Sequence, residues 1–287
     1  MGKNWAIAIG IDDYQNMTPL QFAQRDAEAV RDFFLKELRF DRVDLFVKKS
    51  PEAQDPPLIH YDDGPPLPAE PTIGNLDSFF DRRFEHPFLE SGDNLWFFFA
   101  GHGKRERGID YLMPIDGSVR RLERTGLAVN YVAERLRRSG ADNVILMLDA
   151  CRDDGAKDGR AGIQGMQKGL VTLYSCSPNE LSYEIEELQQ GAFTYALLEG
   201  LKIQGEGNCA TVERLCQHLK YRVPELTQKY KKRVQTPYPV PEPASKMHLI
   251  LLPQRATLRD VELLKNDAKD AELAARRVQI RPSSRKG

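Results

Sequence analysis

The sequence predicts a three-layer α/β fold, in which a mostly parallel central sheet of about six strands carries helices on both faces. Two short apolar runs, Leu95–Ala100 and Asn143–Leu148, are typical of strands buried on both faces of a parallel sheet. Helical patterns alternate with such runs along the chain, and repeated strand–helix units form parallel sheets that are covered by helices.

The first half of the chain begins with a strand, Trp5–Ile11, and an amphipathic helix, Phe22–Leu38, whose apolar side chains recur on one side. A second strand, Val43–Val47, alternates polar and apolar residues. Residues 50–71 contain seven prolines and predict a surface loop, because proline has no backbone N–H to donate. A helix over Ile73–Phe84 then precedes the first of the two apolar strands.

The second half continues the same alternation. We expect, in order, a hairpin-like segment at Asp110–Ile115, a helix at Val129–Arg138, the strand Asn143–Leu148, a strand at Gly169–Tyr174, helices at Phe193–Leu201 and Val212–Tyr221, and a last strand at Met247–Leu252. These elements place residues 1–253 in one domain.

Residues 254–287 are expected to form a C-terminal linker or tail, partly helical or disordered. Leu258, Val261, Leu264 and Ala268 are spaced to line one face of a helix, whereas Arg276–Gly287 is basic and Ser-rich and predicts a mobile segment. Two interpretations stay open, a linker that leads to a further segment and an ordinary disordered terminus.

Composition excludes several classes of function. A formal net charge of −1 over 287 residues gives no general attraction to nucleic acid or to an anionic membrane, and no apolar run approaches the roughly 20 residues that span a bilayer. Residues 1–15 lack the pattern of a signal peptide, and four cysteines are too few for a disulfide scaffold, so we expect a cytoplasmic protein. Zinc is not expected, because Cys209, Cys216 and His218 do not make a ligand set.

A histidine and a cysteine follow the two apolar strands. His102 lies in the sequence Gly-His-Gly directly after the first strand, and Cys151 follows the second one in Asp-Ala-Cys-Arg. Because ligands bind at the carboxyl ends of the strands of an open parallel sheet, we expect both side chains at the same edge. A cysteine nucleophile with a histidine beside it is the smallest set of catalytic residues that a cysteine hydrolase needs.

These motifs resemble the catalytic signature of the caspase-like clan, in which Ala-Cys-Arg follows the catalytic histidine by about fifty residues. The resemblance covers about Asn4 to Pro253 and extends to Ser91–Asn94, Tyr111–Pro114 and Phe193–Leu198. Within the clan, the sequence is most similar to the bacterial metacaspase and paracaspase-like group, also called orthocaspases. The fold that it implies is the caspase-like three-layer sandwich.

The resemblance implies a cysteine peptidase that works with a Cys–His dyad through an acyl-enzyme. Cys151 is the expected nucleophile and His102 the expected proton carrier. The backbone N–H groups of Gly103 and Cys151 are the expected oxyanion hole, since a glycine lets the backbone approach the substrate closely. No third member of a triad is evident from the sequence.

The residue two positions before the nucleophile points to the substrate. Caspases have a glutamine directly before Ala-Cys and cleave after aspartate, whereas this chain has Asp149, as metacaspases and paracaspases do, which cleave after arginine or lysine. By the same resemblance Asp26 and Glu184 are further acidic residues of the substrate pocket. Such carboxylates attract a guanidinium and repel an acidic side chain. The residues alone also permit Asp149 as a helix cap, Asp26 as a surface charge and Glu184 as one of several loop glutamates.

The segment after the nucleophile is rich in charge and glycine. Asp153, Asp154 and Asp158 offer carboxylates to Ca²⁺, which some metacaspases bind, but their spacing is not that of an EF-hand and a solvated loop explains them as well. We therefore expect no required cofactor, with Ca²⁺ as an option. Arg160 lies between glycine-rich sequences and is the favoured site of self-cleavage.

The sequence thus predicts a monomeric endopeptidase whose partners are protein substrates with exposed Arg or Lys. Two alternatives stay open. The first is a catalytically silent caspase-fold interaction module with a misaligned or closed dyad. The second is a flavodoxin-like ligand-binding domain, which the acidic sequence Gly10–Tyr14 disfavours because it would repel phosphate.

Overall fold

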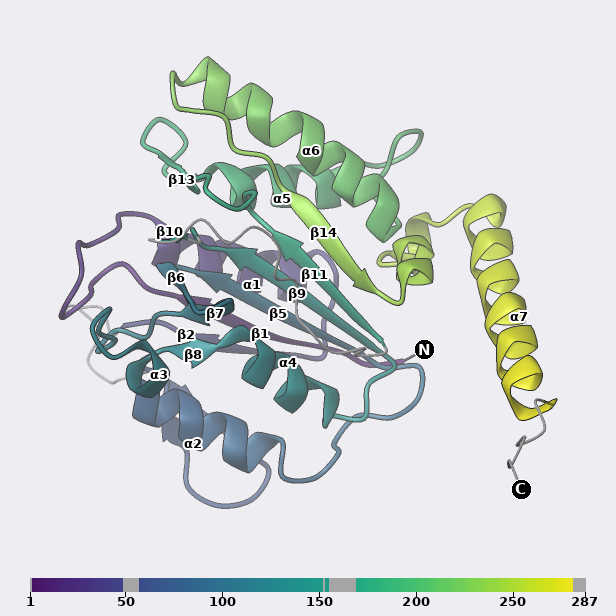
Figure 1. Ribbon diagram of the computed structural model, residues 1–287, viewed down its shortest axis with the longest axis horizontal. Helices are drawn as coiled ribbons and strands as arrows, with labels where there is room; N and C mark the ends of the chain where they lie inside the picture. The colour runs from purple at the N-terminus through teal and green to yellow at the C-terminus, as the bar shows by residue number, and fades with distance from the viewer. Residues whose placement is uncertain (1, 49–56, 152, 155–168, 281–287) are drawn as a thin grey trace, which may run out of the picture.

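The structure is a computed structural model that describes residues 2–48, 57–151, 153–154 and 169–280, with the side chains of 153–154 and 271–280 excepted. A six-stranded sheet forms its centre (Figure 1). Across the sheet the strands are β14 (Tyr238–Glu242), β11 (Leu170–Tyr174), β9 (Asn143–Asp149), β5 (Asn94–Ala100), β1 (Asn4–Gly10) and β2 (Arg42–Phe46). Every neighbouring pair is parallel except β11 with β14, so the predicted mostly parallel sheet is confirmed.

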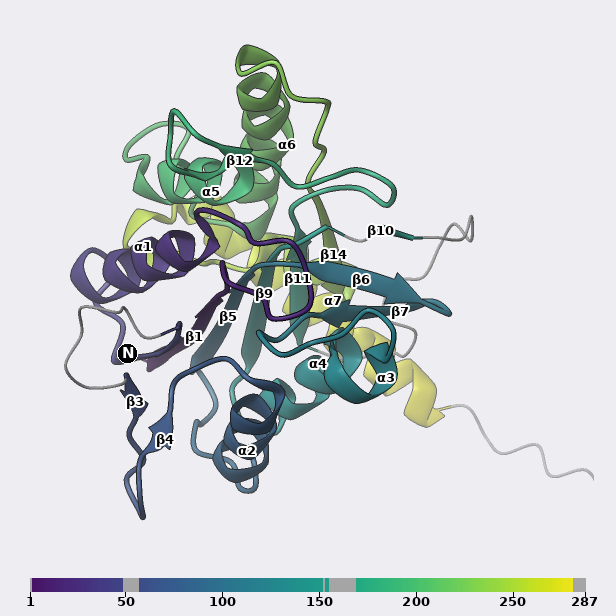
Figure 2. The same cartoon turned by 90° about the vertical axis from the view of Figure 1, so that its left-hand side faces the viewer.

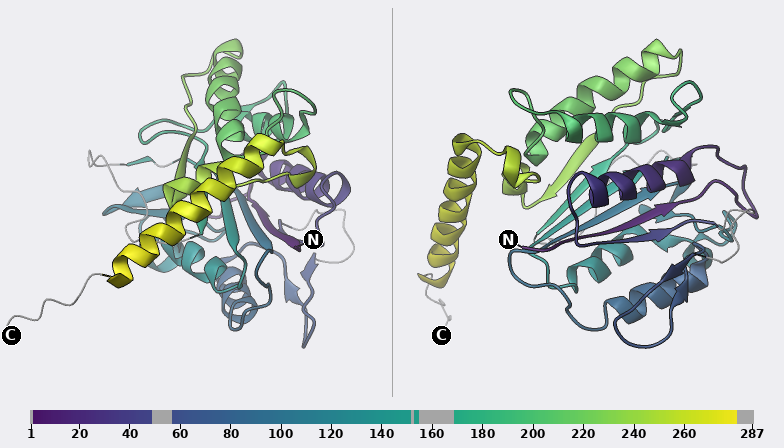
Figure 3. Two further views of the ribbon diagram at one scale, coloured as in Figure 1. Left: turned by 90° about the vertical axis from the view of Figure 1, so that its right-hand side faces the viewer. Right: turned by 180° about the vertical axis from the view of Figure 1, so that it is seen from behind.

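Helices cover both faces of this sheet (Figures 1 and 3). One layer consists of α1 (Ala23–Lys36), α5 (Ala192–Lys202) and α6 (Val212–Lys229), and the other of α2 (Ile73–Arg83) and α4 (Val129–Arg137). Alternate residues of β5 enter alternate layers: Trp96 and Phe98 pack with the first, Phe97 and Phe99 with the second. Successive side chains of a strand point to opposite faces, so an all-apolar strand needs a core on each side.

Smaller strands surround the carboxyl ends of the central strands (Figure 2). A second sheet joins β6 (Gly103–Glu106), β7 (Ile109–Leu112), β8 (Leu127–Ala128) and β10 (Asp153–Asp154), beside the short helix α3 (Leu122–Thr125). Two hairpins add β3 (Leu58–Ile59) with β4 (Leu67–Pro68), and β12 (Glu184–Ile185) with β13 (Gln190–Gly191). The proline-rich segment 50–71 therefore contains a short hairpin where we expected only a loop.

The expected last strand, Met247–Leu252, is wrong. The sixth strand is β14, and residues Ala244–His248 and Pro253–Arg255 form 3-10 turns η1 and η2. Strand β14 has proline at 239 and 241, where a central strand would lose ladder hydrogen bonds. It tolerates them because it is an edge strand. The Gly169 N–H donates to the Glu242 carbonyl, so the backbone nitrogens of the alternate residues 239 and 241 point away from β11 and would bond to no neighbouring strand.

Two helices follow α5, and the first of them is longer than expected. Helix α6 continues eight residues past the expected end at Tyr221, through Pro224. Helix α7 (Leu258–Ile280) begins in the expected tail and stands apart from the two helix layers (Figure 3). Its contacts to the domain include an ion pair of Asp260 with Arg214 and a hydrogen bond between Asp267 and His248 Nδ1, both at 2.7 Å. Of the residues expected to line one apolar face, Leu258 is 85% exposed and Leu264 36% exposed, whereas Val261 is half-buried.

None of the helices within the described residues is both long and apolar enough to cross a membrane.

Candidate active site

Most of the residues that the sequence singled out line one small cavity at the carboxyl ends of β5 and β9. Its volume is about 80 Å³, and its lining includes His102, Cys151, Asp26, Asp149 and Glu184. The parallel register pairs Ala100 with Asp149, which brings the residues that follow both strands to the same edge of the sheet. The expected placement of His102 and Cys151 at one edge agrees with this geometry.

Gly103, another sequence-predicted residue, is not among the residues that line the cavity. Gly103 lies beside it, in β6, and a Cβ atom at this position would overlap the carbonyl oxygen of Cys151. The close approach of the Cys151 backbone therefore requires glycine at position 103. This holds whether or not the Gly103 N–H belongs to an oxyanion hole. Arg160 lies outside the described residues.

His102 is held by the loop that joins β1 to α1. Its Nε2 atom lies 2.8 Å from the carbonyl oxygen of Thr18, and its backbone N–H donates to the hydroxyl of Tyr14 at 2.7 Å. The imidazole also contacts the Tyr14 ring, with 4.7 Å between the ring centroids. Burial lowers the pKa of His102, and Lys104 lowers it further. A carbonyl only accepts hydrogen bonds, so Nε2 carries the proton and Nδ1 is the basic nitrogen of the neutral ring.

Cys151 is half-buried and contacts Ser182. The Ser182 N–H donates to the Cys151 Sγ atom at 3.0 Å, and the Ser182 carbonyl oxygen lies 3.7 Å from the same sulfur. All four cysteines of the chain are thiols, and the other three are buried. Burial raises the pKa of Cys209 to about 11 and that of Cys216 to about 12, which makes them poor nucleophiles. Partial exposure at the cavity distinguishes Cys151 from them.

Asp26 and Asp149 form a pair of buried carboxylates at the N-terminus of α5. Asp26, 2% exposed, accepts from the Gly191 N–H at 2.9 Å, and Asp149, 7% exposed, accepts from the Thr194 hydroxyl at 2.7 Å and its N–H at 3.3 Å. A Cβ at Gly191 would lie 2.8 Å from Asp26 and 2.7 Å from Asp149, so both acids reach the same backbone position. Burial raises the pKa of both, and the charge of Asp149 raises that of Asp26 further.

Glu184 lines the cavity but is already bonded to the protein. Its carboxylate accepts from the N–H groups of Gln21 at 3.0 Å and Phe22 at 2.7 Å, at the start of α1. Asp12 accepts from the Gln24 N–H of the same helix at 3.0 Å. Two acidic side chains thus cap α1, whose own N-cap residue offers no side-chain hydrogen bond. Burial raises the pKa of Glu184.

Sequence reasoning missed the residues that connect these groups. Ser182 bridges the nucleophile and the acidic pair, since its hydroxyl donates to Asp149 at 2.5 Å while its N–H faces Cys151. The buried Gln235 donates to the Ser182 hydroxyl at 3.0 Å and accepts from the Tyr183 N–H at 3.0 Å. Ser182 and Gln235 are in loops without a local pattern. Only the proximity of Ser182 to the predicted Glu184 in the sequence was a signal.

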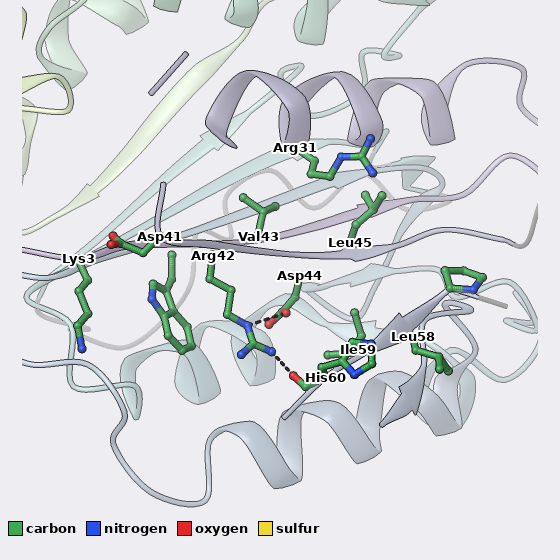
Figure 4. A pocket seen from close by; sticks show the side chains of 12 residues that line it. Lys3, Arg31, Asp41, Arg42, Val43, Asp44, Leu45, Leu58, Ile59 and His60 are labelled. Carbon is green, nitrogen blue, oxygen red and sulfur yellow. Dashed lines mark hydrogen bonds and ion pairs between the residues drawn. The ribbon is translucent and has the colours of Figure 1, made fainter. Parts of the chain in front are cut away.

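A larger hollow of about 730 Å³ lies elsewhere, along the edge strand β2 (Figure 4). There Arg42 forms a 2.9 Å ion pair with Asp44 and donates to the His60 carbonyl. None of the sequence-predicted site residues that the structure describes lines this hollow.

No group of three or more His, Cys, Asp or Glu side chains suited to a metal ion occurs among the described residues. The carboxylates expected to offer a Ca²⁺ site, those of Asp153, Asp154 and Asp158, lie outside the described part of the chain. Ca²⁺ binding stays an expectation.

Comparisons with known proteins agree on one family. The family model of the caspase domain matches residues 3–247. A paracaspase from Dictyostelium discoideum is 28% identical over 146 residues, which cover 48% of this chain and 35% of the relative, so the match spans about a third of that protein.

Two solved structures share the fold at low sequence identity. A crystal structure of a Geobacter sulfurreducens protein has a TM-score of 0.57 at 16% identity and covers 84% of this chain and 96% of that one. Caspase-1 from Spodoptera frugiperda has a TM-score of 0.53 at 14% identity, with 84% and 87% covered. The predicted caspase-like fold is confirmed.

Proposed function

The chain belongs to the caspase family, and from this premise we propose that it is a cysteine endopeptidase that cleaves proteins after arginine or lysine. The observation that carries the specificity is the buried pair Asp26 and Asp149 in a cavity that also exposes the Cys151 thiol. No lysine or arginine lines this cavity among the described residues. A buried carboxylate pair without a protein cation is a site for a cationic ligand.

The catalytic steps follow from the positions of His102 and Cys151. Cys151 gives its thiol proton to Nδ1 of His102 and, as thiolate, attacks the scissile carbonyl and forms an acyl-enzyme. His102 donates a proton to the leaving amine and then activates the water that releases the product. The hydrogen bond from Nε2 to Thr18 leaves Nδ1 for both transfers. The backbone N–H groups of Gly103 and Cys151 are our candidates for stabilising the oxyanion.

The substrate's basic side chain would pair with Asp26 and Asp149. A guanidinium can donate two hydrogen bonds to a carboxylate, and its charge would lower the raised pKa values of both acids. An aspartyl side chain in the same cavity would face two buried acids and be rejected. Glu184 adds to the negative potential of the cavity, but its carboxylate oxygens already accept hydrogen bonds from the start of α1. We therefore assign it a smaller part in substrate binding.

The finer subtype is part of the same proposal. We place the chain with the metacaspase and paracaspase-like group because Asp149 precedes the nucleophile by two residues. Self-processing at Arg160, a monomeric state and optional Ca²⁺ dependence complete it.

A silent interaction module is the second candidate, and one observation favours it. Ser182 lies against the Cys151 sulfur, and the cavity of about 80 Å³ is far smaller than the roughly 300–1,000 Å³ of typical ligand pockets. An active enzyme must move Ser182 aside when substrate binds. The flavodoxin-like alternative has less support, because Asp12 and Glu184 occupy the start of α1, where such a fold would bind phosphate.

A panel of fluorogenic peptides tests the proposal. The peptides differ only in ending with Arg, Lys, Gln or Asp before the fluorophore, and wild type is compared with Cys151→Ala, with and without Ca²⁺. We expect turnover of the Arg and Lys peptides that depends on Cys151. Turnover confined to the Asp peptide would overturn the specificity, and no turnover above Cys151→Ala under any condition would favour the silent module.

A further inference from the structure

The two glycines that flank His102 make room for different groups. A Cβ atom at Gly103 would overlap the carbonyl of Cys151, as described above. A Cβ atom at Gly101 would lie 2.5 Å from the hydroxyl oxygen of Tyr14 and 2.9 Å from the ring of Phe99. Real side chains do not approach so closely, so the first glycine of Gly-His-Gly leaves space for the Tyr14 hydroxyl.

Tyr14 contacts His102 in two independent ways. Its hydroxyl accepts the His102 backbone N–H at 2.7 Å, and its ring lies against the imidazole at a centroid distance of 4.7 Å and an interplanar angle of 49°. Burial raises the pKa of Tyr14, so the hydroxyl stays neutral and able to accept this bond. The residue thus fixes both the main chain and the ring of the histidine.

The loop that carries Tyr14 also carries the third contact of His102. Thr18, four residues later, accepts the hydrogen bond from Nε2. The loop itself is anchored: Ile11 N–H donates to Ala100 at 3.1 Å, and Gln15 N–H donates to Ile115 at 2.9 Å. A loop bonded to the end of β5 on one side and to residue 115 on the other can hold the histidine in a fixed orientation.

We propose that Tyr14 is a positioning residue that acts through His102. The Tyr14 ring maintains the hydrogen bond from His102 Nε2 to the Thr18 carbonyl and so keeps Nδ1 unprotonated. The Tyr14 hydroxyl fixes the backbone of His102, which directly follows β5. The inference rests on the proposed peptidase function for its kinetic consequence, but the state of the histidine can be measured without any activity. Tyr14 itself is not among the residues that line the cavity.

Nuclear magnetic resonance of the histidine side chains tests the positioning directly. Long-range ¹H–¹⁵N spectra, recorded against pH on the full chain with Cys151→Ala, report the tautomer and pKa of His102, assigned by loss of its signals in His102→Gln. We expect the Nε2–H tautomer with a pKa below about 6.5, the ordinary value for histidine. In Tyr14→Leu the imidazole should sample both tautomers, and its pKa should rise as water replaces the ring. The comparison leaves unchanged the other charged groups near His102, which are Asp26, Asp149, Glu184 and Lys104.

Kinetics on the active chain complete the test. Tyr14→Phe keeps the ring and removes the hydroxyl, so we expect kcat to fall about three- to tenfold, the effect of one hydrogen bond, with KM changed less than about twofold. Tyr131→Phe is the matched control, because Tyr131 packs against Phe80 in α2, away from the site. It should keep kcat within about twofold.

The outcomes separate this proposal from the peptidase assignment. Unchanged tautomer and pKa of His102 in Tyr14→Leu, together with unchanged kcat in Tyr14→Phe, would overturn the role of Tyr14. If Tyr14→Leu does not fold, unchanged kcat in folded Tyr14→Phe overturns it. A chain without turnover on any peptide refutes the peptidase instead, and the histidine spectra still decide the role of Tyr14.

Discussion

Replacing Asp26 by asparagine should make the protein more stable and less active. Asp26 is 2% exposed, and its pKa is raised first by burial and then by the charge of Asp149. A buried charge beside a like charge destabilises the folded state. The asparagine oxygen can still accept the Gly191 N–H, and Gln190 can rotate its amide toward the new N–H₂ group. Asp26→Asn therefore removes the charge with little change in shape.

The gain in stability depends on pH, and its sign follows from the raised pKa. A carboxylic acid whose pKa is higher in the folded state than in the unfolded one destabilises the folded state as pH rises above about 4, the unfolded value. The difference between Asp26→Asn and wild type should therefore be near zero at about pH 4 and grow until pH passes the folded pKa. We expect about 1–3 kcal/mol at pH 7.5, or several degrees in Tm.

The loss of activity comes from the same charge. A hydrogen bond between a guanidinium and a carboxylate contributes about 1.5–3 kcal/mol, so kcat/KM for arginyl peptides should fall by roughly 10- to 150-fold. Urea unfolding at pH 4.5 and 7.5, combined with arginyl-peptide kinetics, measures both effects. Asp63→Asn, at an exposed position between β3 and β4, is the control and should change neither. A variant that is less stable than wild type at pH 7.5, or that retains full kcat/KM, would refute the reasoning.

Three further experiments test other parts of the account. Cys151→Ala should abolish peptidase activity and keep the fold, whereas Cys176→Ala, Cys209→Ala and Cys216→Ala should stay active, since those three thiols are buried; substantial turnover by Cys151→Ala contradicts the assignment. Glu184→Ala should lower the free energy of unfolding by about 0.5–2 kcal/mol, as loss of a helix cap does, and reduce arginyl kcat/KM less than Asp26→Asn; the reverse order would make Glu184 a binding residue first. On a denaturing gel, wild type should show fragments of about 160 and 127 residues from cleavage after Arg160, while Cys151→Ala runs intact; active enzyme that is entirely full-length excludes processing as a requirement.

The sequence predicted the fold where an element depends on a local pattern or on a strongly apolar segment. Strands β5 and β9 could be placed because a strand between two helix layers must be apolar on both faces. Strand β14 could not, because its prolines are tolerated only at the edge of a sheet, and edge position is a property of the assembled fold. The continuation of α6 past Tyr221, through Pro224, was missed for a related reason, since packing of Val223 and Leu226 offsets the local cost of the proline.

The candidate site was predictable at the strand ends and not in the loops. His102, Cys151 and Asp149 follow from their positions at two neighbouring strands of the sheet. Ser182 and Gln235 come from loops and Thr194 from the start of α5. All three lie far from these strands in sequence, and their hydrogen bonds depend on how these segments pack over the site. The capping of α1 by Glu184 is likewise a contact between residues 162 positions apart, which no local pattern indicates.

Covalent labelling tests the central claim, a reactive Cys151 beside a pocket for basic side chains, most directly. Two peptidyl electrophiles that differ only in an arginine or an aspartate at the first position are incubated with the native chain, and the labelled residue is mapped by mass spectrometry. The account predicts that the arginyl compound modifies Cys151, at a rate that falls at least tenfold in Asp26→Asn, and that the aspartyl compound leaves it unmodified. Modification of Cys151 by both compounds at equal rates, or of another cysteine instead, would contradict it.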